Sequence, residues 1–155
     1  MPVSLIINKR GAEKMLIRKD DVKIAEKKEF MGGKNSIFMN VLLDLPLFTG
    51  AGRVYNKVVI PPKCSLGYHI HKNDSEAYYI LEGSGLYNDN GEIVEVSAGD
   101  LTFTPDGCGH AMENNTDKNL VMLACVLFNF EKDKDAVSLR KIKKNGTLTK
   151  VDMHE

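Results

Sequence analysis

The chain has 155 residues, 43% hydrophobic and 27% charged, which suits one folded domain and argues against a disordered or collagen-like chain. Its 21 basic and 21 acidic side chains cancel, so no net positive field attracts nucleic acid or an anionic membrane. No apolar run approaches the ~20 residues of a membrane span, and the N-terminus has no secretory signal pattern. We therefore expect a cytoplasmic protein whose three cysteines are free thiols, with no nucleic acid and no membrane among its partners.

The ends of the chain are more basic than its middle. Residues 1–28 carry eight basic and four acidic groups, and residues 131–155 carry seven and five. The stretch between them carries six basic and twelve acidic groups. The simplest interpretation is that charged, solvated ends flank an ordinary core. An acidic middle that favours a bound cation is the alternative.

The sequence predicts three parts. Residues 1–35 form a charged N-terminal arm, in which residues 13–30 could be a short helix or an extended segment. Residues 36–130 form an all-β domain. Residues 131–155 form a charged tail, in which an Asn-Gly pair could turn a final hairpin.

Short strand-like segments follow one another through the middle of the chain. We predict strands at residues 37–43, 53–60, 93–96, 101–104 and 120–128, and two more strands within residues 68–81. Gly, Pro and Asn residues separate these segments, and Asp89-Asn90-Gly91 is a strong hairpin signal. Nine consecutive apolar residues at 120–128 predict a strand buried on both faces. Many short strands with such turns indicate a sandwich or a barrel.

Three of the four histidines lie in this strand-rich region: His69, His71 and His110, with His154 in the tail. His69 and His71 are two residues apart, so on a strand both imidazoles point to one side. Glu76 follows a short polar insert and could lie opposite them on the next antiparallel strand. Three imidazoles and a carboxylate suit Mn, Fe, Co, Ni, Cu or Zn better than Ca or Mg. A lone histidine could equally be a buried, hydrogen-bonded side chain.

The spacing of these residues resembles the two motifs of the cupin superfamily. In the first motif, H-x-H is followed by three or four residues, Glu, six residues and Gly. The residues that match it are His69, His71, Glu76 and Gly83. The second motif is Gly, five residues, Pro-x-Gly, two residues, His, three residues and Asn. The residues that match it are Gly99, Pro105, Gly107, His110 and Asn114.

This resemblance implies a double-stranded β-helix (jelly-roll) barrel that holds one divalent transition metal through His69, His71, Glu76 and His110. The four-residue spacing before Glu76 is similar to that of germins, which favour manganese. One position departs from the first motif, because Lys63 stands where the family usually has a glycine. Such a change affects the shape of a loop, and Gly67, which lies nearer the histidine pair, could serve the turn instead.

The alternation of side chains along a strand then predicts which residues line the cavity. If Glu76 faces inward, so does Tyr78, whereas Tyr79 faces outward. Tyr78 is a candidate catalytic acid or substrate hydrogen-bond partner, with a barrel-filling aromatic as the alternative. If His110 faces inward, so does Met112, two residues further along the strand.

Three more side chains could approach this cavity. Phe103 is expected to line it. Cys108 could reach the metal but is expected to be a buried thiol without a catalytic duty. Lys57 could bind an anionic substrate, although a surface position is the expectation.

Two functions of different classes are compatible with the resemblance. The first is a small metalloenzyme that acts on a small oxygenated substrate (a sugar, sugar phosphate, uronate or diketone) by isomerase, lyase or dioxygenase chemistry. The second is a barrel that binds a metal and a small ligand without turnover. The intact ligand set favours the enzyme, but the acidic lid of oxalate decarboxylation has no clear counterpart. The long arm predicts a homodimer, in which it covers sheet edges of the partner.

Overall fold

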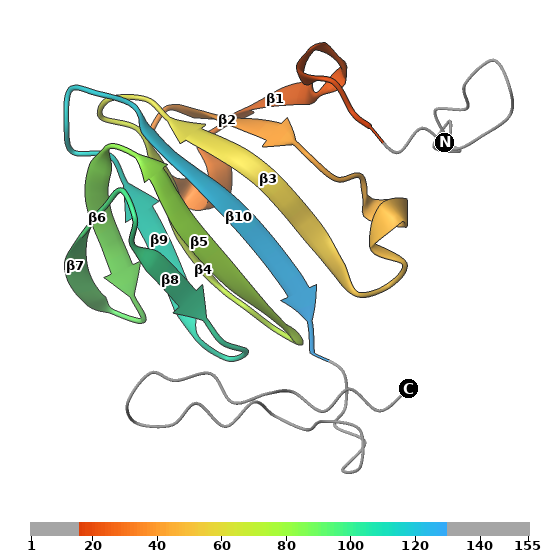
Figure 1. The fold of residues 1–155 in the computed structure, drawn as a ribbon. Helices are drawn as coiled ribbons and strands as arrows, with labels where there is room; N and C mark the ends of the chain where they lie inside the picture. The colour runs from red at the N-terminus through yellow and green to blue at the C-terminus, as the bar shows by residue number, and fades with distance from the viewer. Residues whose placement is uncertain (1–15, 130–155) are drawn as a thin grey trace, which may run out of the picture.

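Two antiparallel β-sheets face each other in a computed structural model that describes residues 16–129 (Figure 1). The strands are β1 (Lys23–Lys28), β2 (Ser36–Val41), β3 (Gly52–Ile60), β4 (Ser65–Ile70), β5 (Asp74–Glu82), β6 (Ser84–Asp89), β7 (Glu92–Ser97), β8 (Leu101–Thr104), β9 (Gly109–Glu113) and β10 (Leu120–Phe128). The short 3-10 turns are η1 (Lys19–Asp21), η2 (Phe30–Gly32) and η3 (Leu45–Phe48). The larger sheet has the order β1-β2-β3-β10-β5-β8, and the smaller has the order β4-β9-β6-β7. This is the jelly-roll arrangement expected from the sequence.

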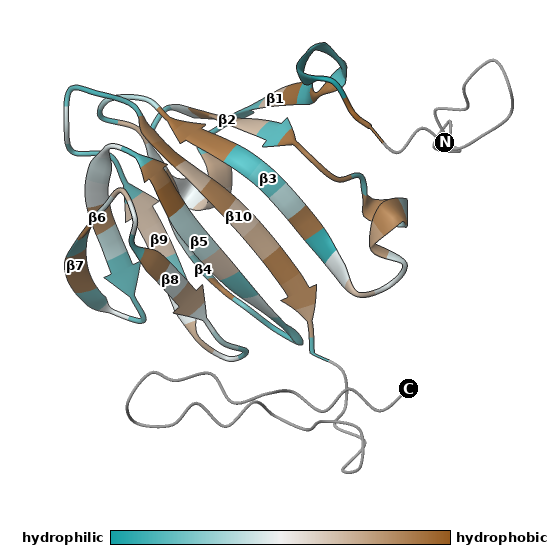
Figure 2. Ribbon diagram, viewed as in Figure 1, coloured by the Kyte–Doolittle hydropathy of each residue, from teal (hydrophilic) through white to brown (hydrophobic). Residues whose placement is uncertain are grey.

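The core lies between the two sheets. Alternate residues along each strand face this space, because side chains on a strand point to opposite sides in turn. Side chains that are at most 1% exposed come from both sheets and include Ile60, Tyr78, Ile80, Met112 and Met122. Hydrophobic stretches are visible as brown bands along β10, β5 and β3 in Figure 2. Burial of these side chains holds the inward strand faces, and hence the candidate ligands, in fixed positions.

The seven strands predicted in the middle of the chain are all present. One open alternative is settled, and one expectation changes. In the segment that could have been a helix or an extended arm, Lys23–Lys28 form the edge strand β1, paired with β2. Its exposed lysines suit a sheet edge, since charged side chains discourage pairing with another chain. The expectation that β10 is buried on both faces is wrong beyond Met122. Leu127 is 50% exposed, because no described residue covers the outward face there.

The backbone conformation of Lys63, in the loop before β4, accounts for the glycine that the family usually has at this position. Its φ is 61°, a left-handed conformation in which glycine is the easiest residue. The suggestion that Gly67 serves this turn is wrong, because Gly67 lies within β4. A Cβ at Gly67 would overlap the backbone oxygen of Met31, so this glycine permits close contact between β4 and the η2 turn. The other motif glycines, Gly83, Gly99 and Gly107, have φ values of 79°, 98° and 83°, as tight turns at these positions require.

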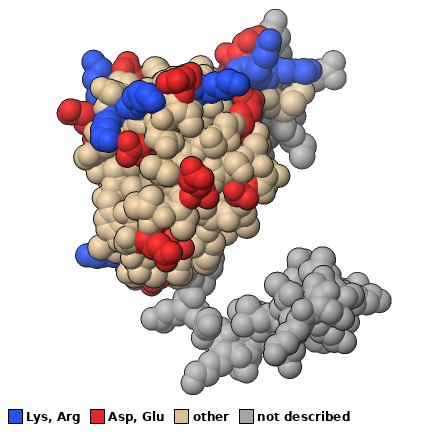
Figure 3. All heavy atoms as spheres, turned by 90° about the vertical axis from the view of Figure 1, so that its left-hand side faces the viewer, with Lys and Arg blue, Asp and Glu red and all other residues tan. Residues whose placement is uncertain are grey.

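The predicted tail at residues 131–155, with its hairpin and His154, lies outside the described residues, as do residues 1–15 of the arm. Within residues 16–129, no helix has the length and apolarity needed to cross a membrane. On the face drawn in Figure 3, lysine and arginine side chains gather along the upper edge together with acidic ones, and further acidic side chains lie below on a largely uncharged surface. That face therefore presents no broad basic area.

Candidate metal centre

Strands of both sheets bring the four predicted ligands together. His69 on β4 is paired with His110 on β9, and His71 directly follows β4. Glu76 reaches the same point from β5, in the larger sheet. His71, Glu76 and His110 are 2%, 6% and 0% exposed. One nitrogen from each histidine and one carboxylate oxygen all lie within 4.8 Å of one another.

The distances between these atoms suit one transition-metal ion. Nε2 of His110 lies 3.1 Å from Nε2 of His69 and 3.1 Å from Nε2 of His71. Oε2 of Glu76 lies 3.0 Å from Nε2 of His110, 3.1 Å from that of His71 and 3.7 Å from that of His69. Two donors that bind one ion at right angles, each about 2.1 Å away, are about 3.0 Å apart. Most pairs in the cluster therefore have the separation of neighbouring ligands.

The contacts of Nδ1 in His69 and His71 determine which ring nitrogen carries the proton. Nδ1 of His71 lies 2.6 Å from the Asp74 carboxylate, and Nδ1 of His69 lies 3.0 Å from the Gly67 carbonyl oxygen. Both partners accept hydrogen bonds, so in a neutral ring each Nδ1 carries the proton. Each Nε2 then has a free lone pair directed at the cluster. Lone pairs that converge on a buried carboxylate repel it unless a cation or a proton lies between them.

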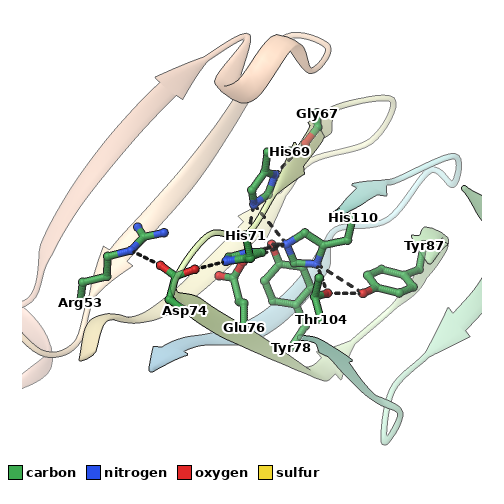
Figure 4. A network of polar contacts seen from close by, with 10 residues as sticks. All are labelled: Arg53, Gly67, His69, His71, Asp74, Glu76, Tyr78, Tyr87, Thr104 and His110. Atoms are coloured by element: carbon green, nitrogen blue, oxygen red, sulfur yellow. Dashed lines mark hydrogen bonds and ion pairs between the residues drawn. The ribbon is translucent and has the colours of Figure 1, made fainter. Parts of the chain in front are cut away.

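The outer partners form a connected network (Figure 4). Nδ1 of His110 lies 2.7 Å from the Thr104 hydroxyl, which is itself 2.7 Å from the Tyr87 hydroxyl. On the other side, Nε of Arg53 donates to Asp74 at 2.8 Å. Burial alone would raise the pKa of Asp74, but the contacts with His71 and Arg53 hold it below its usual value. Outer partners of this kind orient metal-binding imidazoles.

The charges of the cluster are strongly coupled. Burial would raise the pKa of Glu76, but its close contacts with His110, His69 and His71 hold it well below its ordinary range. The hydrogen bond with Glu76 raises the pKa of His71, against the effect of burial. Burial lowers the pKa of His110 and favours its neutral ring. Ionised Glu76 and the three imidazoles, once each Nε2 has lost its proton, are the donor set that a divalent transition metal prefers.

Tyr78 lies inside the barrel against this cluster. Its hydroxyl is 3.1 Å from Oε2 of Glu76 and 3.3 Å from Nε2 of His110, and its ring stacks on that of His110. Burial, and then the charge of Glu76, raise the pKa of Tyr78 well above its usual value. The side chain is therefore a neutral hydrogen-bond donor to Glu76. Its catalytic role remains a prediction.

A cavity of about 90 Å³ opens beside the cluster. Most of its lining is apolar, and strand β3 contributes Arg53 and Asn56. The η2 turn contributes Phe30 and Met31. The two motifs do not point to these four residues, which lie apart from both in the sequence. Only the fold brings them to the site.

Three other candidates lie apart from the cavity. The expectation for Phe103 is wrong, since it is 60% exposed and is paired with Ala77 on the outward face. Lys57 lies on the outward face of β3, between the inward residues at 56 and 58, as expected. Cys108 is half-buried rather than buried, and it is not among the clustered ligand atoms.

Comparisons with known proteins agree with this geometry. Residues 56–126 match the family profile described as "Cupin domain". Over 113 residues the chain is 34% identical to the "Oxalate-binding protein" of Thermotoga maritima, covering 73% of this chain and 93% of that protein. It is 30% identical over 92 residues to an uncharacterized protein of Methanocaldococcus jannaschii, covering 59% and 74%. A Thermotoga maritima crystal structure described as a "predicted oxalate decarboxylase" matches with a TM-score of 0.71 and 33% identity, covering 74% of this chain and 100% of that one. The chain belongs to the cupin superfamily.

Proposed function

We propose that the chain binds one divalent transition-metal ion through His69, His71, Glu76 and His110, and holds a small oxygenated acid such as oxalate at that ion. The observation that carries this proposal is the convergence of three Nε2 atoms and one carboxylate oxygen within 4.8 Å. Four protein donors leave coordination positions open on a six-coordinate ion. A bound ion would polarise an oxygen atom of the ligand.

The size of the cavity supports a small ligand. Pockets for drug-sized molecules measure roughly 300–1,000 Å³, whereas this cavity measures about 90 Å³. A ligand of a few heavy atoms therefore fits better than a sugar phosphate or a uronate. The name of the Thermotoga maritima relative, an oxalate-binding protein, points to the same class of ligand.

The test is calorimetric titration of oxalate into metal-loaded and chelator-treated protein, after the metal content of each has been measured. We expect about one ion per chain in the loaded protein and oxalate binding that requires the ion. Acetate, with one carboxylate, should bind much more weakly and is the control. Equal oxalate binding with and without metal, or none by the loaded protein, would contradict the proposal.

Turnover of the ligand is a second candidate, favoured by the position of Tyr78. Its neutral hydroxyl is buried within 3.3 Å of two candidate ligands, and its single proton could turn from Glu76 toward a bound substrate. Tyr78→Phe should then retain metal and ligand binding while product formation falls. Product formation is followed by incubating loaded protein with oxalate, small 2-oxo acids and diketones. Absence of product from all of them leaves binding as the function.

A further inference from the structure

The wall of the cavity formed by β3 contains an irregularity at Arg53. On β3, Gly52 is paired with Leu127 of β10. The next paired residue, Val54, faces Val126, so Arg53 is the extra residue of a β-bulge. Bulges beside binding sites redirect a side chain away from the face dictated by alternation. Here Arg53 lines the cavity, although regular alternation from Asn56 would turn it outward.

Arg53 has unused hydrogen-bonding capacity in the cavity. Its Nε donates to Asp74, which in turn contacts His71 (Figure 4). No hydrogen bond joins its terminal nitrogens to any residue between 16 and 129, and the side chain is 45% exposed. A guanidinium presents paired N–H groups whose spacing matches the two oxygens of a carboxylate. The remaining donors of Arg53 are therefore suited to an anion inside the cavity.

Asn56 provides a second, independent indication. It is 9% exposed and lines the same cavity. Within the described residues its amide has a single hydrogen-bond contact, 4.0 Å from Nδ2 to the thioether sulfur of Met39, a weak acceptor. Buried polar side chains are normally satisfied by protein, water or ligand. Because its one contact is weak, the Asn56 amide at the cavity wall is available to hydrogen-bond a bound molecule.

We propose that Arg53 and Asn56 form a carboxylate-binding wall that selects the ligand of this site. The ligand class is a small dicarboxylate or 2-oxo acid, with one end at the histidine cluster and a carboxylate at Arg53, hydrogen-bonded by Asn56. Apolar neighbours in the cavity, including Val54, Val58 and Ala124, strengthen these contacts by excluding water. This inference rests on the proposed function, since it names the residues that would recognise the acid.

The test compares oxalate affinity among metal-loaded variants by calorimetry. Arg53→Gln and Asn56→Leu should retain about one ion per chain and bind oxalate at least about tenfold more weakly, since each loses a hydrogen bond to a charged group. Lys57→Gln is the matched control, because it removes a positive charge from the outward face of the same strand. It should leave oxalate affinity unchanged. Asn56→Ala repeats the test if Asn56→Leu does not fold.

Arg53 also supports Asp74, so its variant is measured at saturating metal. Weaker oxalate binding by Arg53→Gln at saturating metal supports the inference. An oxalate affinity equal to that of the wild type in both Arg53→Gln and Asn56→Leu overturns it. In that case the proposed function stands, because the wild-type protein still binds oxalate through its metal. Wild-type protein that is loaded with metal and fails to bind oxalate overturns both. The two failures are thus distinguishable.

Discussion

His71 lies between two carboxylates. Its Nδ1 is 2.6 Å from Asp74, and its Nε2 is 3.1 Å from Glu76. Without a cation in the cluster, a proton on each ring nitrogen satisfies both contacts. A metal ion needs the lone pair of Nε2, so the proton and the ion compete for the same atom. The motif revealed the ligand Glu76, but not that Asp74 is the outer partner, because that contact depends on how the chain turns after His71.

This competition predicts a pH dependence. In metal-free protein the pKa of His71 is raised above 6.5 and that of His110 is lowered below it. Stability from protonated His71 is therefore fully present below pH 6.5 and is lost as the pH rises through its raised pKa. Metal affinity should rise over the same range, as Nε2 loses its proton. NMR titration of the imidazole protons, with and without chelator, measures the pKa of His71. A midpoint at or below pH 6.5 for His71 in metal-free protein would contradict the prediction.

The strands show what the sequence could and could not determine. Alternation along β5 placed Tyr78 beside Glu76 on the inward face, because the period of a strand is two residues. The same rule failed for Phe103, because it separates two faces without saying which one is buried. The answer depends on register, in which Thr104 is opposite Glu76 and Phe103 is opposite Ala77. Register comes from long-range pairing, which a single sequence does not show.

The contact between η2 and β4 is also long-range, and Gly67→Ala tests it. The new Cβ would overlap the backbone oxygen of Met31, which cannot move as freely as a side chain. We expect a loss of about 3 kcal/mol in the free energy of unfolding, measured by denaturant titration. Gly32→Ala is the control, because its Cβ meets no atom within 4 Å and only its φ of +78° is unfavourable. It should cost about 1 kcal/mol, and equal losses in both variants would contradict the account.

At the scale of the whole molecule, the larger sheet has an exposed apolar outward face. Tyr79 and Leu101 are paired across β5 and β8 and are 44% and 65% exposed. Phe103 and Leu127 extend this area at 60% and 50%. Contiguous apolar surface on a folded domain commonly marks an interface between proteins. We propose that it contributes to the homodimer expected from the N-terminal arm.

Light scattering at micromolar concentration tests the homodimer. We expect the mass of two chains for the wild-type protein. The double variant Leu101→Lys and Phe103→Lys should shift toward the mass of one chain, because charges placed in an apolar interface lose solvation. Its metal content should not change, since both side chains lie on the face opposite the cavity. A wild-type protein with the mass of one chain would count against this proposal.

The measurement that tests the metal centre most directly is the metal content of protein purified without chelator. Wild type and His154→Ala should each hold about one divalent transition-metal ion per chain. His71→Ala and His110→Ala should retain only a small fraction of it, because each removes a buried donor from a cluster of four. Full occupancy in either of these two variants, or its loss in His154→Ala, would contradict the assignment of the site.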